Sequence, residues 1–489
     1  MTIDQTATPP APAPAPTTPM TPASTNPYLS GAYEPVQREV AVEGLEVIGE
    51  LPAGLNGTFI RNGPNPQFAP RGRYHIFDGD GMLHAVSLSE GRAAYRNRWI
   101  ESKGLLAERK RGRAVFGGLS EFAFPDPDVA EEIGGILKNT ANTNIVGHAG
   151  RLLALMEAVP PTEIAAGTLD TIGEYDFDGA LQGSMTAHPR PDAATGELHF
   201  FGAVPFPPFL RYHVVDAQGA LIRSVDIDLG RAEMMHDFVI TGSHVVFFSL
   251  PALFDIEAMM SGAPGIRWDA DAGARIGVLS RDGGAATSAD VSWYEIDPCF
   301  VFHFLNAWDE PDGRIVIDGC RSPRMNVSFG DDDPVGDDVV PTLHRWEVDP
   351  ASGRVTLTQL DDRAADFPRI PDVMTGRRNR YGTVAHSARW GGDGEVVFDG
   401  VTQHDLHAGT SITHRYGTDV AAGEPVFAPD PDGSGELDGW YVNFVTDLTD
   451  RSARFVVLDA RDIAAGAVAE VVLPERVPFG FHGNWFPDT

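Results

Sequence analysis

The sequence has 489 residues, among them 53 Gly, 38 Pro and 27 Phe, and its formal net charge is −32. Such an acidic chain is not expected to bind nucleic acid, which needs Lys and Arg to meet phosphates, or to dock electrostatically on anionic lipid. The only two cysteines, Cys299 and Cys320, exclude a disulfide framework or a thiolate metal site and fit a reducing, cytoplasmic setting.

Residues 1–27 are dominated by Pro, Ala and Thr and contain little that could be buried. This composition predicts a disordered or polyproline-like tail. The segment lacks the basic start and apolar run of a signal peptide, so we expect none. No run of about 18 apolar residues predicts a membrane-spanning helix. We expect residues 28–489 to form a single domain.

From Tyr28 onward, short runs rich in Val, Ile, Phe and Tyr alternate with turn sequences such as DPASGR and PDPDGSGE. The sequence predicts helices only around 127–138 and 251–260. Many short strands at regular spacing favour an all-β propeller or large barrel, although the pattern alone does not exclude a pair of sandwiches. No short exact repeat is visible, which disfavours WD40 or kelch arrays. Strands are predicted at 197–204, 244–250, 314–320, 343–349, 395–401, 441–447 and 454–460.

Four of the 15 histidines lie among apolar or aromatic residues, namely His188, His236, His303 and His482. A buried imidazole needs partners for its ring nitrogens, and convergence on one metal ion would provide them for all four. The ligands would come from distant points of the chain, as a ring-like fold allows. Imidazole ligands suit Zn, Cu, Fe or Ni, so residue types alone do not identify the metal.

The segments around these histidines resemble the carotenoid cleavage oxygenase family, which includes carotenoid and apocarotenoid dioxygenases and lignostilbene-cleaving enzymes. The similarity extends from about Glu34 to Pro487. Its most specific segments are NGTFIRNGPNP (56–66), FDGDGMLH (77–84), LLALMEA (152–158), MTAHP (185–189), MMHDF (234–238), FHFLNAWD (302–309), DFPRI (366–370), EPVFAPD (424–430) and FHGNW (481–485).

The resemblance implies a seven-bladed β-propeller, with a few short helices and loops that cap the active site. It also implies one Fe(II) per subunit, held on the propeller axis by Nε2 of the four histidines, and O₂ as co-substrate. Carboxylates at Glu157, Asp366 and Glu424 would accept the outer ring N–H of three histidines and so orient them. The family usually has Glu at the position of Asp366, so we expect a backbone adjustment or a bridging water there. Thr143 matches a position whose methyl group crowds one open coordination site.

The same resemblance bears on the substrate. Relatives that cleave stilbenes or phenylpropenes carry Lys just before the first carboxylate and a nearby Tyr, where this chain has Met156 and Leu119. These apolar side chains, with Phe302, would line a tunnel for a long apolar polyene better than a site for a phenolate. We therefore expect O₂-dependent cleavage of a carotenoid or apocarotenoid double bond into two carbonyl products, with a stilbene or phenylpropene as the alternative substrate.

Two apolar segments, 204–210 and 250–260, are candidates for the cavity entrance and for weak peripheral membrane contact. We expect a monomer whose partner is an apolar small molecule. Two further functions stay open from the residues alone. One is a propeller hydrolase with Ca²⁺ or Zn²⁺, although such sites use Asp, Glu and Asn, and the other is a binding propeller without catalytic activity.

Overall fold

The structure is a computed structural model that describes residues 26–203, 206–282, 286–325, 339–390 and 396–488. The predicted tail lies outside these ranges apart from Asn26 and Pro27. Pro27 begins the first 3-10 helix, η1 (Pro27–Leu29), and the Asn26 side chain accepts a hydrogen bond from the backbone N–H of Tyr28 at 2.9 Å. Both residues therefore belong to the folded part of the chain, two residues earlier than predicted.

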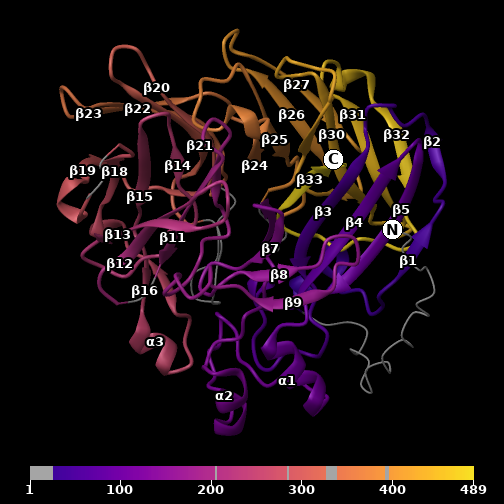
Figure 1. The fold of residues 1–489 in the computed structure, drawn as a ribbon, viewed down its shortest axis with the longest axis horizontal. Coiled ribbons are helices and arrows are strands. Elements are labelled where there is room, and N and C mark those ends of the chain that lie inside the picture. The colour runs from indigo at the N-terminus through magenta and orange to yellow at the C-terminus, as the bar shows by residue number, and fades with distance from the viewer. Residues whose placement is uncertain (1–25, 204–205, 283–285, 326–338, 391–395, 489) are drawn as a thin grey trace.

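Seven antiparallel sheets of four to six strands form the blades of a β-propeller, which confirms the predicted fold (Figure 1). We number the blades in chain order. Blade 1 contains β1 (Ala41–Glu43), β3 (Gly57–Pro64), β4 (Gly81–Ser89), β5 (Arg92–Trp99) and β33 (Gly483–Pro487). Blade 2 contains β6 (Asn144–His148), β7 (Arg151–Leu155), β8 (Thr162–Ile164) and β9 (Thr171–Glu174). Blade 3 contains β10 (Arg190–Asp192), β11 (Glu197–Ala203), β12 (Phe209–Val215) and β13 (Leu221–Asp228).

The remaining four blades continue around the ring. Blade 4 contains β14 (Val239–Ile240), β15 (His244–Ser249), β18 (Ala274–Ser280) and β19 (Ser292–Ile296). Blade 5 contains β20 (Phe300–Asp309), β21 (Ile315–Ser322), β22 (Thr342–Asp349) and β23 (Arg354–Gln359). Blade 6 contains β24 (Ala365–Arg369), β25 (Tyr381–His386), β26 (Gly400–Asp405) and β27 (Thr410–Arg415). Blade 7 contains β28 (Val420–Ala422), β29 (Val426–Pro429), β30 (Gly439–Asp447), β31 (Ala453–Asp459), β32 (Ala467–Val472) and β2 (Val47–Gly49). A separate pair is formed by β16 (Ala252–Phe254) and β17 (Ile266–Trp268).

The two ends of the chain close the ring twice. In blade 1 the last strand, β33, pairs with β3, so that Trp485 faces Phe59 across the ladder. In blade 7 the early strand β2 pairs with β32, with Ile48 opposite Glu470. Closure pairs edges that would otherwise be exposed, and it locks first and last segments into the same sheets.

Apolar side chains fill the spaces between neighbouring blades. Between blades 4 and 5, for example, the ring of Phe248 lies 4.4 Å from that of Phe304 and 5.3 Å from that of Trp346, and all three are fully buried. Every residue of β20 except its last is buried, because this strand is covered on both faces. Strand runs rich in Phe and Val are therefore typical of the inner part of each blade.

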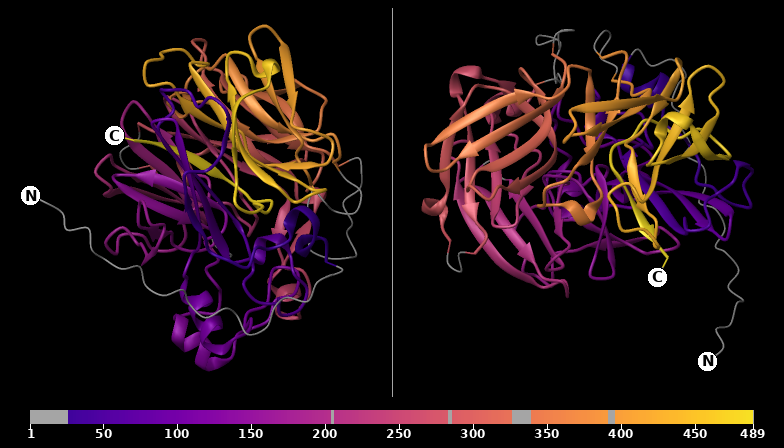
Figure 2. Two further views of the ribbon diagram at one scale, coloured as in Figure 1. Left: turned by 90° about the vertical axis from the view of Figure 1, so that its right-hand side faces the viewer. Right: turned by 90° about the horizontal axis from the view of Figure 1, so that it is seen from above.

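Three α-helices lie together on one side of the propeller, α1 (Lys103–Arg111), α2 (Pro127–Ile133) and α3 (Ile256–Met260) (Figures 1 and 2). The 3-10 helices are η1, η2 (Gly31–Tyr33), η3 (Ile76–Asp78), η4 (Ala270–Ala272), η5 (Ser288–Asp290), η6 (Asp372–Met374) and η7 (Ile463–Ala465). Within the described ranges, no helix has the length and apolar character needed to cross a bilayer.

Several sequence-based boundaries are wrong. The helix predicted around 127–138 ends at Ile133, because Gly134 adopts a left-handed conformation (φ 74°) that stops it. The helix predicted around 251–260 begins as strand β16, and its helical part starts only after Asp255, whose side chain caps α3. Helix α1 was not predicted. In the predicted strand 395–401 the ladder starts only at Gly400, preceded by isolated bridges, while residues 204 and 395 lie outside the described ranges.

Candidate metal centre and substrate cavity

Four blades bring the four predicted histidines to one point. His188 stands just before β10, His236 just before β14, His303 within β20 and His482 just before β33. All four are buried, and one ring nitrogen from each lies within 4.8 Å of those of the other three. The Nε2 atoms of His188 and His236 are 2.9 Å apart, and those of His236 and His303 are 3.2 Å apart.

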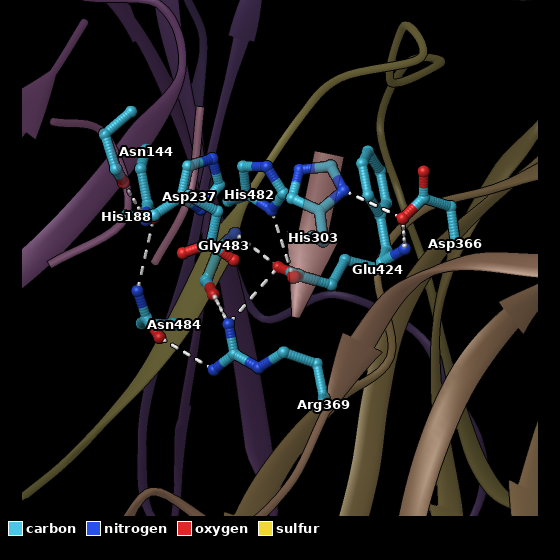
Figure 3. A network of polar contacts seen from close by, with 12 residues as sticks. Asn144, His188, Asp237, His303, Asp366, Arg369, Glu424, His482, Gly483 and Asn484 are labelled. Atoms are coloured by element: carbon cyan, nitrogen blue, oxygen red, sulfur yellow. Dashed lines mark hydrogen bonds and ion pairs between the residues drawn. The ribbon is translucent and has the colours of Figure 1, made fainter. Parts of the chain in front are cut away.

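The other three blades supply carboxylates to the outer nitrogens of three of these rings, and Figure 3 shows those of His303 and His482. Each blade therefore contributes one residue to the centre, either an imidazole or an acid. The pairs, from carboxylate oxygen to Nδ1, are Glu157 with His236, Asp366 with His303 at 2.8 Å, and Glu424 with His482 at 3.0 Å.

This arrangement fits one divalent metal ion. A ring that gives its Nδ1 proton to a carboxylate presents a lone pair at Nε2, and the Nε2 atoms face one another at the centre. Lone pairs this close repel unless a cation lies between them. Two neighbouring ligands about 2.1 Å from an ion and about 90° apart stand about 3.0 Å from each other, which agrees with the two Nε2 separations.

The charges around the centre have clear physical causes. Burial opposes the charge of Glu424, but Arg369 and His482 outweigh it and hold the pKa of Glu424 at about 2. Burial, followed by the three neighbouring imidazoles, holds the pKa of His188 well below its usual range. Burial would likewise lower the pKa of His303, but Asp366 raises it overall, as expected for a ring that keeps its Nδ1 proton. A neutral His188 is what metal ligation requires.

Asp366 reaches its histidine directly although its side chain is shorter than the Glu usual in the family. The adjoining Phe367 has a φ of 49°, and the pairing of β24 with β25 shifts register between Asp366 and Arg369. The same Asp366 oxygen accepts the backbone N–H of Phe367 at 2.8 Å. We expected either a backbone adjustment or a bridging water at this position. The backbone adjustment is present, and it brings the carboxylate to His303 without a bridging water.

A cavity of about 940 Å³ opens on His236, His303 and His482. Its walls are mainly apolar, and its size is typical of sites for small organic ligands. The helical cap helps to close it, since Ile256 and Met259 of α3 and Leu137, which follows α2, line it. All four residues expected near the substrate or the metal lie on its wall, namely Thr143, Met156, Leu119 and Phe302.

Two chemically different groups of side chains stand out in the cavity wall. We call the part lined by Met156, Met234, Met235 and Met259 the methionine arm. We call the part lined by Tyr28, Tyr33, His75, Trp390, Phe398 and Phe479 the aromatic arm. Phe302, whose ring centre is 4.9 Å from that of His236, borders the first, and Phe367, 4.8 Å from His482, borders the second. A ligand next to the centre could therefore extend into both.

The two segments predicted to form the cavity entrance, 204–210 and 250–260, lie in different environments. In the first, residues 204–205 lie outside the described ranges and Phe206 is exposed. In the second, Leu250 is buried in the core, whereas α3 places Met259 on the cavity wall and leaves Met260 exposed. Phe254 at the end of β16 and Ile256 and Met259 of α3 thus line the cavity, whereas Leu250 does not.

A second cavity of about 240 Å³ reaches the centre and is the more polar of the two. It shares only His303, Phe367 and His482 with the large cavity among the described residues, and it reaches His188, which the large cavity does not. The imidazoles thus stand between an apolar space and a polar one.

Asp78 lies on the cavity wall, and the sequence did not single it out. Its Oδ1 accepts the backbone N–H of Leu119 at 2.8 Å, and its Oδ2 accepts that of His75 at 2.9 Å. It therefore anchors the loop that carries Leu119 over the cavity. Burial raises the pKa of Asp78 to about 6, although both hydrogen bonds oppose this shift. Asp78 belongs to the segment FDGDGM, whose sequence predicted a tight turn but gave no indication of a contact with the loop of Leu119.

A further group of candidate metal ligands is already neutralised. Asp192, Glu197 and His199 lie close enough to hold an ion. The guanidinium of Arg281 lies among them, paired with Asp192 and 3.1 Å from Nε2 of His199. This cation takes the place that a metal ion would need.

Comparison with known proteins identifies the family. The family model described as retinal pigment epithelial membrane protein matches residues 33–487. A carotenoid cleavage oxygenase of Mycobacterium tuberculosis is 36% identical, over 95% of this chain and 98% of its own. The carotenoid 9,10(9′,10′)-cleavage dioxygenase 1 of Arabidopsis thaliana is 35% identical, over 93% of this chain and 89% of its own. The crystal structure of Pseudomonas brassicacearum lignostilbene dioxygenase has a TM-score of 0.89 and 32% identity, covering 96% of this chain and 100% of that one. The chain therefore belongs to the carotenoid cleavage oxygenase family of oxidoreductases, as its motifs predicted.

Proposed function

We propose that this protein is an Fe(II)-dependent dioxygenase that cleaves a carbon–carbon double bond of a carotenoid or apocarotenoid with O₂, giving two carbonyl products. The observation that carries this proposal is the opening of the four-imidazole cluster onto a large apolar cavity. Iron, when bound, supplies the electron chemistry that makes O₂ reactive toward an alkene, which amino-acid side chains cannot supply. The names of the curated relatives support the substrate class.

The protein's own residues would do three things for this reaction. The three carboxylates fix which ring nitrogens of His236, His303 and His482 face the centre and so keep their three lone pairs convergent. The apolar walls exclude water and hold the alkene beside the centre. Thr143 lies on the cavity wall, and its carbonyl accepts the backbone N–H of His482 at 3.0 Å, so it restricts the space next to that ligand.

The cavity wall favours a polyene over a phenol. Met156 and Leu119 both line it, where stilbene-cleaving relatives would present Lys and Tyr. Neither side chain can neutralise or hydrogen-bond a phenolate. A stilbene or phenylpropene remains the second candidate, because the fold is so similar to that of a lignostilbene dioxygenase.

We further propose that the substrate enters from an apolar phase. Leu119, Ile136 and Leu137 line the cavity and are also exposed, so its rim is apolar. Such a rim would make weak, peripheral contact with a membrane while the acidic surface limits electrostatic attraction. Cosedimentation with neutral phosphatidylcholine vesicles should detect this contact, and Leu137→Ser should reduce it. We expect the protein to act as a cytoplasmic monomer.

The deciding experiment is mass spectrometry of products from a small substrate panel. β-Carotene, several apocarotenals, resveratrol and isoeugenol are incubated with protein, O₂ and added Fe(II), alongside the His303→Ala variant as a control for background oxidation. Paired aldehydes or ketones from a polyene support the proposal. Products from resveratrol or isoeugenol alone would establish the second candidate. Activity that survives without iron or O₂ would refute both.

A further inference from the structure

The first described residues of the chain contribute to the wall of the aromatic arm. Asn26, Pro27, Tyr28 and Tyr33 all line the cavity. We call residues 26–33 the N-terminal strap; it contains η1 and η2. The family model begins at residue 33, so nearly all of the strap precedes the region by which the family is recognised.

Contacts with three separate parts of the fold hold the strap in place. The side-chain amide of Asn26 donates to the carbonyl of Tyr74 at 2.8 Å. The hydroxyl of Tyr33 donates to the carbonyl of Val396 at 2.5 Å and accepts that residue's N–H at 3.1 Å. The backbone N–H of Phe479 donates to a strap carbonyl at 2.7 Å. These hydrogen bonds fix the strap against the rest of the cavity wall.

A continuous run of rings connects the strap with the metal centre. The ring of Tyr33 lies 5.0 Å from that of Phe479, which lies 6.4 Å from that of Phe367, and Phe367 lies 4.8 Å from His482. Tyr28 adds to the outer end of this run, with its ring 5.5 Å from that of Tyr33. A ligand beside the imidazoles that extends along this arm reaches the strap.

We propose that the N-terminal strap is the end wall of the aromatic arm, and that Tyr28 determines which substrate end groups fit there. This inference rests on the proposed function, because it concerns the end of a polyene. Aromatic faces pack well against a rigid ring, whereas flexible thioethers adapt to a linear chain. The aromatic arm therefore receives the cyclic end of the substrate, and the methionine arm receives the linear part.

Tyr28 is suited to this role by its position in η1. Its ring packs edge-on against His75 at 5.1 Å and lines the cavity. The next residue, Leu29, is in the same turn and also half-buried, but it does not line the cavity. Tyr28→Ala and Leu29→Ala thus form a matched pair, since each removes a large side chain from one turn and only the first changes the wall.

The first test compares two polyenal substrates of equal length, the cyclic β-apo-8′-carotenal and its acyclic counterpart apo-8′-lycopenal. Tyr28→Ala should raise KM for the cyclic substrate about tenfold, with kcat and the acyclic KM nearly unchanged, because only contact with the ring is lost. Leu29→Ala should leave both KM values as in the parent. Deletion of residues 2–25, which keeps the strap, should also leave both KM values unchanged. Equal KM changes for the two substrates, or equal changes in the two variants, would overturn the proposal.

A binding measurement separates this proposal from the proposed function. Quenching of tryptophan fluorescence by β-ionone, the cyclic end alone, needs no turnover, and Trp390 in the aromatic arm provides a reporter. Tyr28→Ala should weaken β-ionone binding about tenfold and Leu29→Ala should not. If the parent protein cleaves no polyene but shows this difference, the strap is supported and the proposed function fails. If it cleaves polyenes but both variants bind β-ionone like the parent, the strap proposal fails alone.

Discussion

Asp366 offers the sharpest test of how the centre is built. It is buried, it contacts Nδ1 of His303 at 2.8 Å, and it is the acid at which this chain departs from the family's usual Glu. Three variants separate its properties. Asp366→Ala removes the hydrogen bond and the charge, Asp366→Asn keeps an acceptor oxygen without the charge, and Asp366→Glu keeps the charge on a longer side chain.

The expected magnitudes follow from the contact. A hydrogen bond to a charged partner contributes about 1.5–3 kcal/mol, so Asp366→Ala should weaken metal binding about 10- to 100-fold. Asp366→Asn should lose about half of that free energy. Asp366→Glu adds one C–C bond, about 1.5 Å, to a contact that is already at hydrogen-bond distance in a buried site. Overpacking of this kind costs about 1–3 kcal/mol, so the residue usual in the family should weaken metal binding here.

The assay measures metal affinity apart from turnover. Purified variants are loaded with Co(II), whose visible absorption reports its ligand geometry, and then titrated with a competing chelator; bound iron after dialysis gives a second measure. Thermal unfolding of the metal-free proteins shows whether a variant is simply less stable. If Asp366→Glu binds Co(II) as tightly as the parent with an unchanged spectrum, the local backbone does not require the shorter acid.

Three further predictions address the ligands, the cavity and the loop anchor. His303→Ala should abolish iron retention and turnover, and a normal iron content in that variant would contradict its role as a ligand. Met156→Lys should raise KM for apolar polyenes about tenfold or more, because it buries a charge in an apolar wall; an unchanged KM would remove this residue from the substrate path. Because the pKa of Asp78 is raised to about 6, its protonation should stabilise the folded state as the pH falls through 6 toward 4, yet weaken its hold on Leu119. KM should therefore rise below pH 6 in the parent and lose this inflection in Asp78→Asn.

The sequence predicted those features of the site that local segments carry. Each histidine stands in a distinctive apolar context, so His236 in MMHDF and His303 in FHFLNAWD could be recognised one at a time. Which acid faces which ring depends on how the blades close into a ring. Glu157 comes from blade 2 and reaches a histidine of blade 4, a pairing that neither sequence distance nor residue type indicates.

Other features depend on packing that no single segment encodes. Tyr28 adjoins a Pro-rich tract, and nothing in that tract places it in the cavity wall. Its position depends on the neighbouring Tyr33, which contacts Val396 and Phe479 far along the chain. Asp78 belongs to a segment that reads as a turn, and its role appears only when Leu119 is brought to it. Helix ends were missed for a local reason, since Gly134 and Asp255 act through backbone geometry and capping that the periodicity of apolar residues does not report.

The order of residues 156 and 157 links substrate choice to the metal centre. Met156 lines the cavity and Glu157 contacts Nδ1 of His236, so neighbouring side chains serve the substrate and the ligand. A lysine at position 156 could hold a phenolate, but it would also place a cation beside the acid that orients His236, and would compete with that ring for it. An apolar residue avoids this competition and leaves Glu157 to the histidine. Under the proposed function, Met156 would thus serve both the polyene and the geometry of the centre. A change of substrate class at this position should require a compensating change around His236.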